Sequence, residues 1–288
     1  MNKLSRPVVN DFAAIERLAN TRRAKSFPHL RDALETITAG YDQYLAVEGD
    51  ALRVNQVVLS EEVEGYLRAH YASPPTALSH ITALRLEAEQ RVCPMCGSMH
   101  RGTLDHLLPK EDYAVFSVFS QNLIPACKCN IKRGKTVTGE GAGERILHPY
   151  FDECLAERLI AARFEELGKV PHITLRVLTD PAHRHYSAIV FHVREIVSNS
   201  AILKYVSDRW AHLCQLPELA VRALSVVPES VDALRTLLEH ERDLTDRAHG
   251  GRNNWNSVFV TGLLDADVLQ WLYDCLSAPG RDPNGPLL

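Results

Sequence analysis

Cys93-Pro-Met-Cys96-Gly and Thr-Leu-Asp105-His106-Leu-Leu-Pro-Lys110 begin the stretch that decides the fold, and Asn122-Leu-Ile-Pro-Ala-Cys127-Lys-Cys129-Asn130-Ile-Lys-Arg-Gly-Lys135 ends it. Two cysteine pairs bracket an Asp-His pair and two asparagines, and a basic run follows directly. Thiolates suit a structural zinc ion, whereas Asp, Asn and His suit a hard catalytic cation and an activated water. The stretch therefore predicts a small module that is stapled by one metal and does chemistry with another.

The two cysteine pairs are the clearest metal signal. Cys93 and Cys96 form a Cys-x-x-Cys turn, and Cys127 and Cys129 follow some thirty residues later, a spacing typical of structural zinc. Such an ion compensates for a module too small to be stable by burial alone. The second pair has a gap of one residue rather than two, so a damaged or empty zinc site stays open as an alternative. A redox dithiol and unliganded buried cysteines are the others.

The Asp105-His106 pair is expected at the end of a strand. Neighbouring strand residues point to opposite faces, so both side chains reach one site only where the strand ends or bends. His106 suits the removal of a proton from water, and Asp105 suits a divalent cation, Mg²⁺ or Mn²⁺. Asn130 is expected to offer an oxygen to the same cation, and Asn122 to fix the loop that holds His106. The alternative is an ordinary surface or core Asp-His pair.

Basic side chains follow the second cysteine pair. We expect Lys128, Lys132, Arg133 and Lys135 to contact a phosphate backbone, because helical spacing puts three of the lysines on one face. A solvated helix end is the alternative. The basic cluster at residues 22–25 is instead expected to be a solvated face.

The composition is that of an ordinary globular protein. The 288 residues are 45% hydrophobic and 24% charged, enough for one large domain or two to three small ones. The net charge is −4, so any attraction to nucleic acid has to come from a local basic patch. We expect no signal peptide and no membrane span, and the cytoplasm as the location.

The predicted fold class is α+β and mostly helical. We expect an N-terminal helical region over 1–90, the metal-stapled module over 91–152, and a mainly helical C-terminal region with a β-hairpin over 153–288. Helices are predicted at 28–47, after the Ser60 N-cap, and at 76–91, 155–167, 201–214, 217–224, 230–244 and 265–276. Within the module we predict a hairpin at 91–110 and a short helix that starts near Cys127 and ends at Gly134. The C-terminal hairpin is predicted to pair 173–177 with 188–192.

These residues resemble the HNH endonuclease family, also described as the ββα-metal fold. The resemblance covers about residues 91–152 and is carried by the two cysteine pairs, the Asp-His-x-x-Pro string, the two asparagines and the basic run. It implies that His106 is the general base and that Asp105 and Asn130 bind a divalent metal, usually magnesium. It also implies that Asn122 orients the histidine or its loop. The chain departs from the family pattern by one missing residue between Asn122 and Asn130.

A longer string is similar to HNH proteins of bacterial anti-phage systems. Leu-Asp-His-Leu-Leu-Pro-Lys, Asn-Leu-Ile-Pro and a later His-Pro-Tyr-Phe-Asp carry this narrower resemblance, which points to the Septu-type nuclease subunit. That resemblance implies DNA as the target and an ABC-type ATPase as the partner, docked by the helical flanks. The competing functional hypotheses are a non-catalytic, zinc-ribbon-like module that binds nucleic acid or protein, and thiol redox exchange through Cys93 and Cys96.

Overall fold

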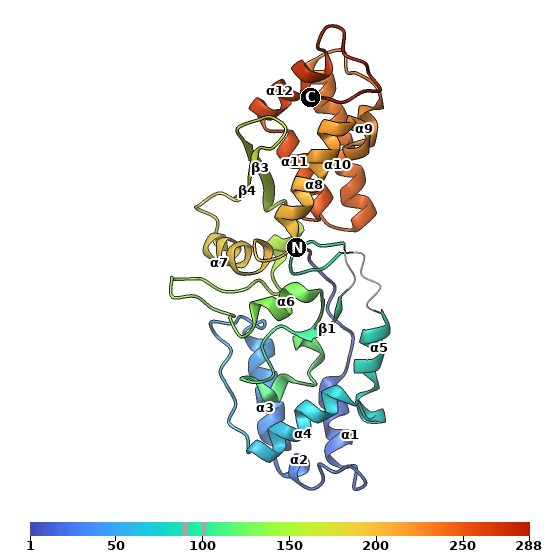
Figure 1. Cartoon of the computed structure of the whole chain (residues 1–288). Helices are drawn as coiled ribbons and strands as arrows, with labels where there is room; N and C mark the ends of the chain where they lie inside the picture. Colours follow the sequence, from blue (N-terminus) through green and yellow to red (C-terminus); the bar gives the residue numbers. More distant parts are fainter. Residues whose placement is uncertain (88–91, 100–101) are drawn as a thin grey trace.

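The chain builds three successive parts along one long axis in a computed structural model, which describes residues 1–87, 92–99 and 102–288 (Figure 1). The N-terminal helices lie at one end, a small ββα module lies in the middle, and the C-terminal helices lie at the other end. The observed class is mostly helical α+β, as predicted, with two-stranded sheets. No helix of the described ranges is both long and apolar enough to cross a lipid bilayer.

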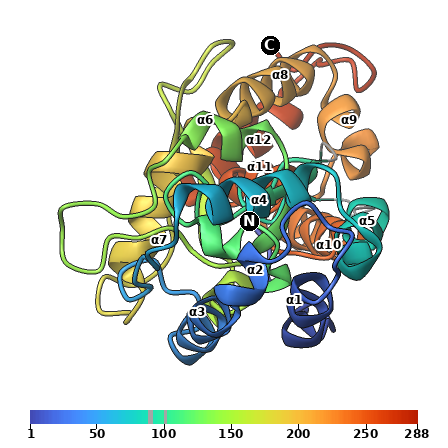
Figure 2. The ribbon, with the colours of Figure 1, turned by 90° about the horizontal axis from the view of Figure 1, so that it is seen from below.

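Helices α1 to α5 form the N-terminal part. Their bounds are α1 (Asp11–Ala19), α2 (His29–Asp32), α3 (Leu34–Ala46), α4 (Glu61–Ala72) and α5 (Ser79–Glu87). The Ser60 side chain accepts a hydrogen bond from the Val63 amide and caps α4, as the sequence predicts. The helix predicted over 28–47 is divided in two at Ala33, and the last residues of the helix predicted over 76–91 lie outside the described ranges. Seen from below, α4 crosses the middle of the molecule (Figure 2).

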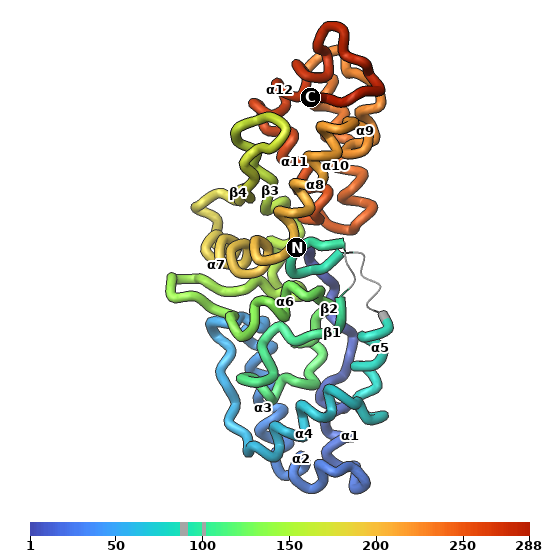
Figure 3. Tube along the Cα trace, in the orientation of Figure 1, coloured from blue at the N-terminus to red at the C-terminus, as the bar shows by residue number. Residues whose placement is uncertain are grey.

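The central sheet pairs β1 (Thr103–His106) with β2 (Leu123–Ala126), antiparallel, and α6 (Lys128–Arg133) follows at once. The two strands lie side by side at the centre of the molecule (Figure 3). Within the described residues, the partner of β1 lies beyond a loop and not before it as in the hairpin predicted at 91–110, while residues 91, 100 and 101 of that hairpin lie outside the described ranges. The cysteine turn at 93–97 is closed by backbone hydrogen bonds instead. The predicted helix is confirmed: Cys127 is its N-cap and Gly134 ends it at a φ of 62°.

The loop between β1 and β2 is anchored to the N-terminal helices by aromatic packing. Tyr41 of α3 stacks on Phe119 with ring centroids 4.2 Å apart, and Tyr44 packs edge-on against Phe116 at 4.8 Å. All four rings are essentially buried. Phe116 and Phe119 therefore support the module by packing against α3.

The C-terminal part contains a second hairpin and a set of helices. Strand β3 (Ile160–Glu165) pairs with β4 (His172–Val177), and the helices are α7 (Tyr186–His192), α8 (Ile202–Gln215), α9 (Pro217–Ala220), α10 (Val231–His249), α11 (Trp255–Leu263) and α12 (Ala266–Leu276). The helix predicted over 155–167 and the strand predicted over 188–192 are wrong. Helix α11 packs so closely on β3 that a Cβ at Gly262 would lie 2.6 Å from the Ala162 carbonyl oxygen. Strand β3 begins with the three buried apolar residues at 160–162, and so short an apolar run does not distinguish a buried strand from a helix.

Candidate functional site

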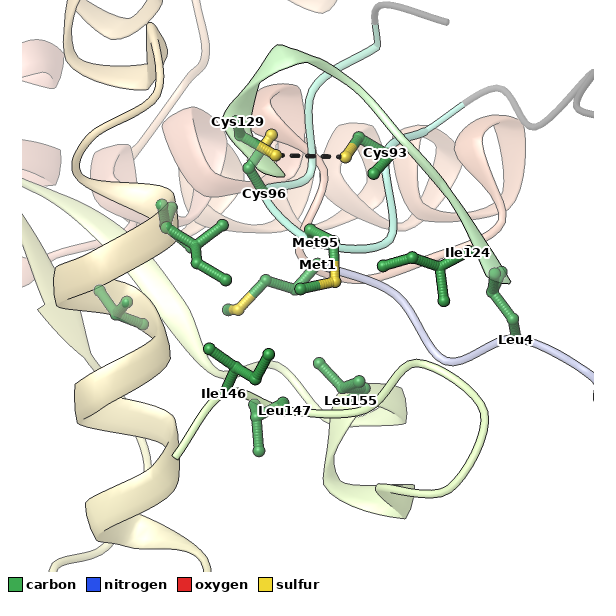
Figure 4. Packing of buried hydrophobic residues seen from close by; sticks show 14 of the residues in the cluster. Met1, Leu4, Cys93, Met95, Cys96, Ile124, Cys129, Ile146, Leu147 and Leu155 are labelled. Carbon is green, nitrogen blue, oxygen red and sulfur yellow. Dashed lines mark hydrogen bonds between the residues drawn. The ribbon is translucent and has the colours of Figure 1, made fainter. Parts of the chain in front are cut away.

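Four cysteine side chains converge in the middle of the molecule. The sulfur of Cys93 lies 3.7 Å from that of Cys129 (Figure 4). The sulfur of Cys96 lies 3.5 Å from that of Cys127. All four sulfurs lie within 4.8 Å of one another. Zn–S bonds of about 2.3 Å in a tetrahedron put neighbouring sulfurs at about 3.8 Å, so the donor set fits a structural zinc ion.

The tight spacing of the second cysteine pair is accommodated by the start of α6. Cys127 is the N-cap, and its sulfur accepts a hydrogen bond from the amide of Cys129 in the first turn. The Cys127 amide also donates to the sulfur of Cys93. Hydrogen bonds among the four sulfurs lower the pKa of Cys93 and Cys127 and raise the pKa of Cys96 and Cys129. One residue between the cysteines is therefore enough for both to reach the cluster.

The cysteine cluster also joins segments that are distant in the sequence. The Trp255 indole N–H of α11 donates to the Cys96 carbonyl at 2.8 Å, and the Asn2 amide donates to the Pro94 carbonyl at 3.0 Å. Buried His192 accepts from the Leu147 amide through Nδ1 and donates to the Met95 carbonyl through Nε2 at 2.7 Å. Zinc at this position would therefore hold the N-terminal segment, the ββα module and the C-terminal helices together.

Asp105 and His106 lie at the end of β1, where they approach each other despite being adjacent strand residues. Nδ1 of His106 is 3.8 Å from Oδ1 of Asp105, which also accepts the His106 backbone amide at 2.8 Å. Nε2 of His106 lies 2.9 Å from the Ser117 carbonyl oxygen, which can only accept, so this nitrogen carries the proton. The lone pair of His106 is consequently on Nδ1, the nitrogen that faces Asp105.

Asn130 and Arg133 of α6 support this pair from behind. The Asn130 amide nitrogen donates to Oδ2 of Asp105 at 2.8 Å and to the His106 carbonyl at 3.0 Å, while its oxygen accepts from Nε of Arg133 at 3.1 Å. Asn130 thus presents a nitrogen to Asp105, and not the oxygen that the sequence led us to expect. Burial alone would raise the pKa of Asp105, but hydrogen bonds that the His106 backbone amide and the Asn130 side chain donate to the carboxylate outweigh it and lower that pKa.

Arg133 lies inside the module and not on its surface. Its side chain is 7% exposed, and its guanidinium donates to the carbonyls of Leu107 at 2.9 Å and Thr136 at 3.0 Å. Burial lowers its pKa to about 10, so the group stays charged at neutral pH. Unlike the prediction from the basic run, Arg133 is not available to a phosphate in this structure. Lys128, Lys132 and Lys135 are exposed, and Lys135 forms an ion pair with Asp112.

Asn122 closes the loop after β1. It is fully buried, its side-chain oxygen accepts from the Leu108 amide at 2.8 Å, and its nitrogen donates to the carbonyls of Leu108 and Phe116. The same oxygen also accepts from the Tyr44 hydroxyl at 3.3 Å. These contacts agree with a loop-fixing role for Asn122. They also position Ser117, which holds the proton on His106.

Two residues of the N-terminal helices complete the site and were missed from the sequence. Tyr71 of α4 packs on the imidazole of His106 with ring centroids 4.2 Å apart, and its hydroxyl donates to the Leu104 carbonyl. Arg85 of α5 lies over the Tyr71 ring at 4.8 Å, and Lys110 lies over it at 5.7 Å. No motif marks Tyr71 or Arg85, because only the packing of α4 and α5 brings them to β1.

Comparisons with known proteins add little to this geometry. A segment of 63 residues is 36% identical to protein ea31 of Escherichia phage lambda, and the match covers 21% of each chain. The chain therefore spans about a fifth of the length of this relative. No protein-family model and no solved structure matches the chain.

Proposed function

We propose that this chain is a metal-dependent HNH-type endonuclease that hydrolyses DNA phosphodiester bonds. The observation that supports it best is the arrangement at the end of β1, where His106 directs an unprotonated Nδ1 toward the ionised carboxylate of Asp105. General-base activation of a water molecule requires a nitrogen lone pair, and Nδ1 supplies one because Nε2 donates to the Ser117 carbonyl. The resemblance of 91–152 to HNH endonucleases assigns His106 the same role.

In the proposed reaction, Nδ1 of His106 takes a proton from water while the water oxygen forms a bond to phosphorus. The bond from phosphorus to the sugar oxygen breaks, and the electron pair leaves with that oxygen. The Ser117 carbonyl stabilises the resulting imidazolium because it accepts from Nε2. Asp105 adds a compensating negative charge at 3.8 Å from Nδ1.

Asp105 is also the residue that would hold a divalent cation, Mg²⁺ or Mn²⁺. Its carboxylate is ionised at neutral pH, and its side chain is 28% exposed. A bound cation of this class stabilises negative charge on the phosphate and on the leaving oxygen. Asn130 contributes differently from the family expectation, because it orients the Asp105 carboxylate through its amide nitrogen.

Exposed lysines of α6 and of the following loop would contact the DNA backbone beside this site. Lys128 and Lys132 lie on the exposed side of the helix, whose buried side carries Asn130. Contacts of this kind are electrostatic, so their contribution to affinity should fall as salt is raised.

The test is cleavage of supercoiled plasmid DNA with and without added Mg²⁺ or Mn²⁺. The wild type should cleave only with the cation, and His106→Ala and Asp105→Asn should each lose at least about a hundredfold in rate. His240→Ala, a change on the exposed face of α10, is the matched control and should retain activity. Equal cleavage by the wild type and His106→Ala would refute the proposal. DNA binding without any cleavage would favour the zinc-ribbon-like binding module instead.

The narrower resemblance to Septu-type subunits extends the proposal to anti-phage defence in the cytoplasm, with an ABC-type ATPase as partner. Its support is the string of residues around Asp105 and the later His-Pro-Tyr-Phe-Asp segment. Loss of phage protection in cells that carry His106→Ala in place of the wild type is the expected result. Equal protection by both would contradict the role of cleavage in defence.

A further inference from the structure

An open cleft of about 720 Å³ lies outside the candidate site, between the N-terminal segment and the C-terminal end of α10. Its lining is strongly basic and comes from four segments of the chain, contributing Lys3, Arg158, Arg242, Arg247 and Arg252. Two acidic residues, Asp243 and Asp246, line it as well. No residue discussed so far for cleavage lines this cleft.

Ion pairs within the cleft neutralise part of its charge but not all of it. Asp246 pairs with Arg158 at 2.5 Å, and Asp243 pairs with Arg242 at 3.1 Å. Lys3 pairs with Glu153 at 3.0 Å. Among the residues that the structure describes, the guanidinium groups of Arg247 and Arg252 have no hydrogen-bond or ion-pair partner, and both residues are exposed. The cleft therefore keeps two cations available to a ligand.

A purely structural role accounts for only one of these two arginines. Arg247 lies in the last turn of α10, where a cation interacts favourably with the helix dipole. Arg252 follows the end of the helix and Gly250, so the same reason does not apply to it. A guanidinium binds phosphate oxygens through two parallel hydrogen bonds, and two such groups in one cleft suit a phosphate-bearing ligand.

The chemistry of the lining favours a duplex backbone over a nucleotide or a single strand. Of the described residues that line the cleft, none is aromatic, so no ring is available for a base to stack on. The cleft is also linked to the candidate site by short contacts. Lys3 donates to the Tyr150 carbonyl at 2.6 Å, and the Tyr150 hydroxyl donates to the carbonyl of Leu123, which pairs with His106. Figure 1 shows the N-terminus between the ββα module and the lower end of α10.

We infer that this cleft binds the phosphate backbone of duplex DNA through Arg247 and Arg252, as an anchor outside the site of cleavage. The inference rests on the proposed function, because the duplex is taken to be the one that His106 would cleave. A duplex carries one charge per about 1.7 Å of its axis, so a ligand of this class offers phosphates to both guanidinium groups.

The experiment measures fluorescence anisotropy of a labelled duplex several turns long. It uses the full chain with His106→Ala, so that the duplex stays intact and no chelator removes zinc. Adding Arg247→Glu and Arg252→Glu should raise Kd at least about tenfold at low salt. The Lys pair, Arg247→Lys and Arg252→Lys, should bind nearly as tightly as the parent. The matched control is Arg22→Glu with Arg23→Glu, which makes the same charge change on an exposed surface elsewhere and should have a much smaller effect.

Equal weakening by the two Glu pairs would overturn the inference, because it would mean that only total charge matters. Unchanged duplex affinity in the variant with Arg247→Glu and Arg252→Glu would overturn the inference too. The same holds if that variant loses binding of ATP or inorganic phosphate while it still binds the duplex. These outcomes are separate from failure of the proposed function, since binding is read without cleavage. If the wild type cleaves plasmid DNA but the cleft variants bind the duplex as tightly as their parent, the inference about the cleft fails and the nuclease proposal stands.

Discussion

Replacing Arg133 by alanine tests whether this residue braces the site from inside or contacts a ligand from the surface. The substitution would leave two buried acceptors without their partner, the Leu107 carbonyl and the side-chain oxygen of Asn130. An unsatisfied buried acceptor costs about 1–3 kcal/mol, so the free energy of unfolding should fall by about 3 kcal/mol. A chain of 288 residues unfolds with an entropy of about 0.6 kcal/mol/K, which converts this loss to a melting temperature lower by about 5 °C.

Lys132→Ala is the matched control, because it removes one positive charge from the neighbouring position while its side chain is exposed. It should leave the melting temperature within about 1 °C and weaken DNA binding instead. Differential scanning fluorimetry and anisotropy on both variants separate the two roles. A melting temperature for Arg133→Ala equal to that of the wild type, together with a loss of affinity like that of Lys132→Ala, would refute the internal role.

Three further predictions concern the metal, the acid sensitivity and the packing of the site. Elemental analysis of the wild type should find one zinc ion per chain. Cys129→Ser should lose the zinc and melt at a lower temperature, whereas Cys275→Ser, which lies outside the cluster, should keep it. Zinc retained by Cys129→Ser would contradict the four-cysteine site. Burial lowers the pKa of His148 to about 3 and that of His192 to about 4. Below pH 6.5 the unfolded chain therefore binds protons that the folded chain does not, and the free energy of unfolding decreases as the pH is lowered. Between pH 7 and pH 5 the two histidines should lower the free energy of unfolding by about 4 kcal/mol, or the melting temperature by about 6 °C. His148→Gln should show about half of that pH dependence. An equal pH dependence in the wild type and in His148→Gln would exclude the buried His148 as its cause. Tyr71→Phe keeps the ring on His106 and should cleave plasmid DNA like the wild type, whereas Tyr71→Ala should cleave it about tenfold or more slowly. Equal cleavage rates for the Phe and Ala variants would show that the ring contact is irrelevant.

The local features of the central module were predictable because they depend on neighbours in the sequence. Cys127 at the N-cap of α6, Gly134 at its end and the Ser60 cap of α4 follow from short-range hydrogen bonding and backbone freedom. The convergence of four cysteines followed from their spacing and from the softness of thiolate ligands. In each of these cases a few residues determine the conformation.

Features that depend on tertiary packing were not predictable in the same way. The buried residues of β3 were predicted as part of a helix because the sequence does not show that α11 covers them. The closeness of that contact depends on Gly262, a hundred positions from Ala162. Arg133 belongs to a basic run yet is buried, since carbonyls that become available only when β1 ends lie within its reach. Tyr71 and Arg85 reach the site through the packing of α4 and α5, and no pattern in the sequence around them indicates it.

The orientation of Asn130 illustrates the same limit at the level of single atoms. The residue type suggests an oxygen ligand for a cation, but its oxygen is occupied by Arg133 and its nitrogen faces Asp105. A flipped amide would put two donors, the Asn130 nitrogen and Nε of Arg133, against each other. The buried guanidinium therefore determines which end of the amide meets the carboxylate.

Chemical rescue of a His106→Gly variant tests the general-base role of His106 most directly. The variant leaves space where the imidazole stood, and free imidazole can enter it and accept the proton from water. We predict that His106→Gly is nearly inactive on plasmid DNA in the presence of Mg²⁺ and that added imidazole raises its cleavage rate in proportion to concentration. Cleavage by His106→Gly at the wild-type rate without imidazole would contradict the account.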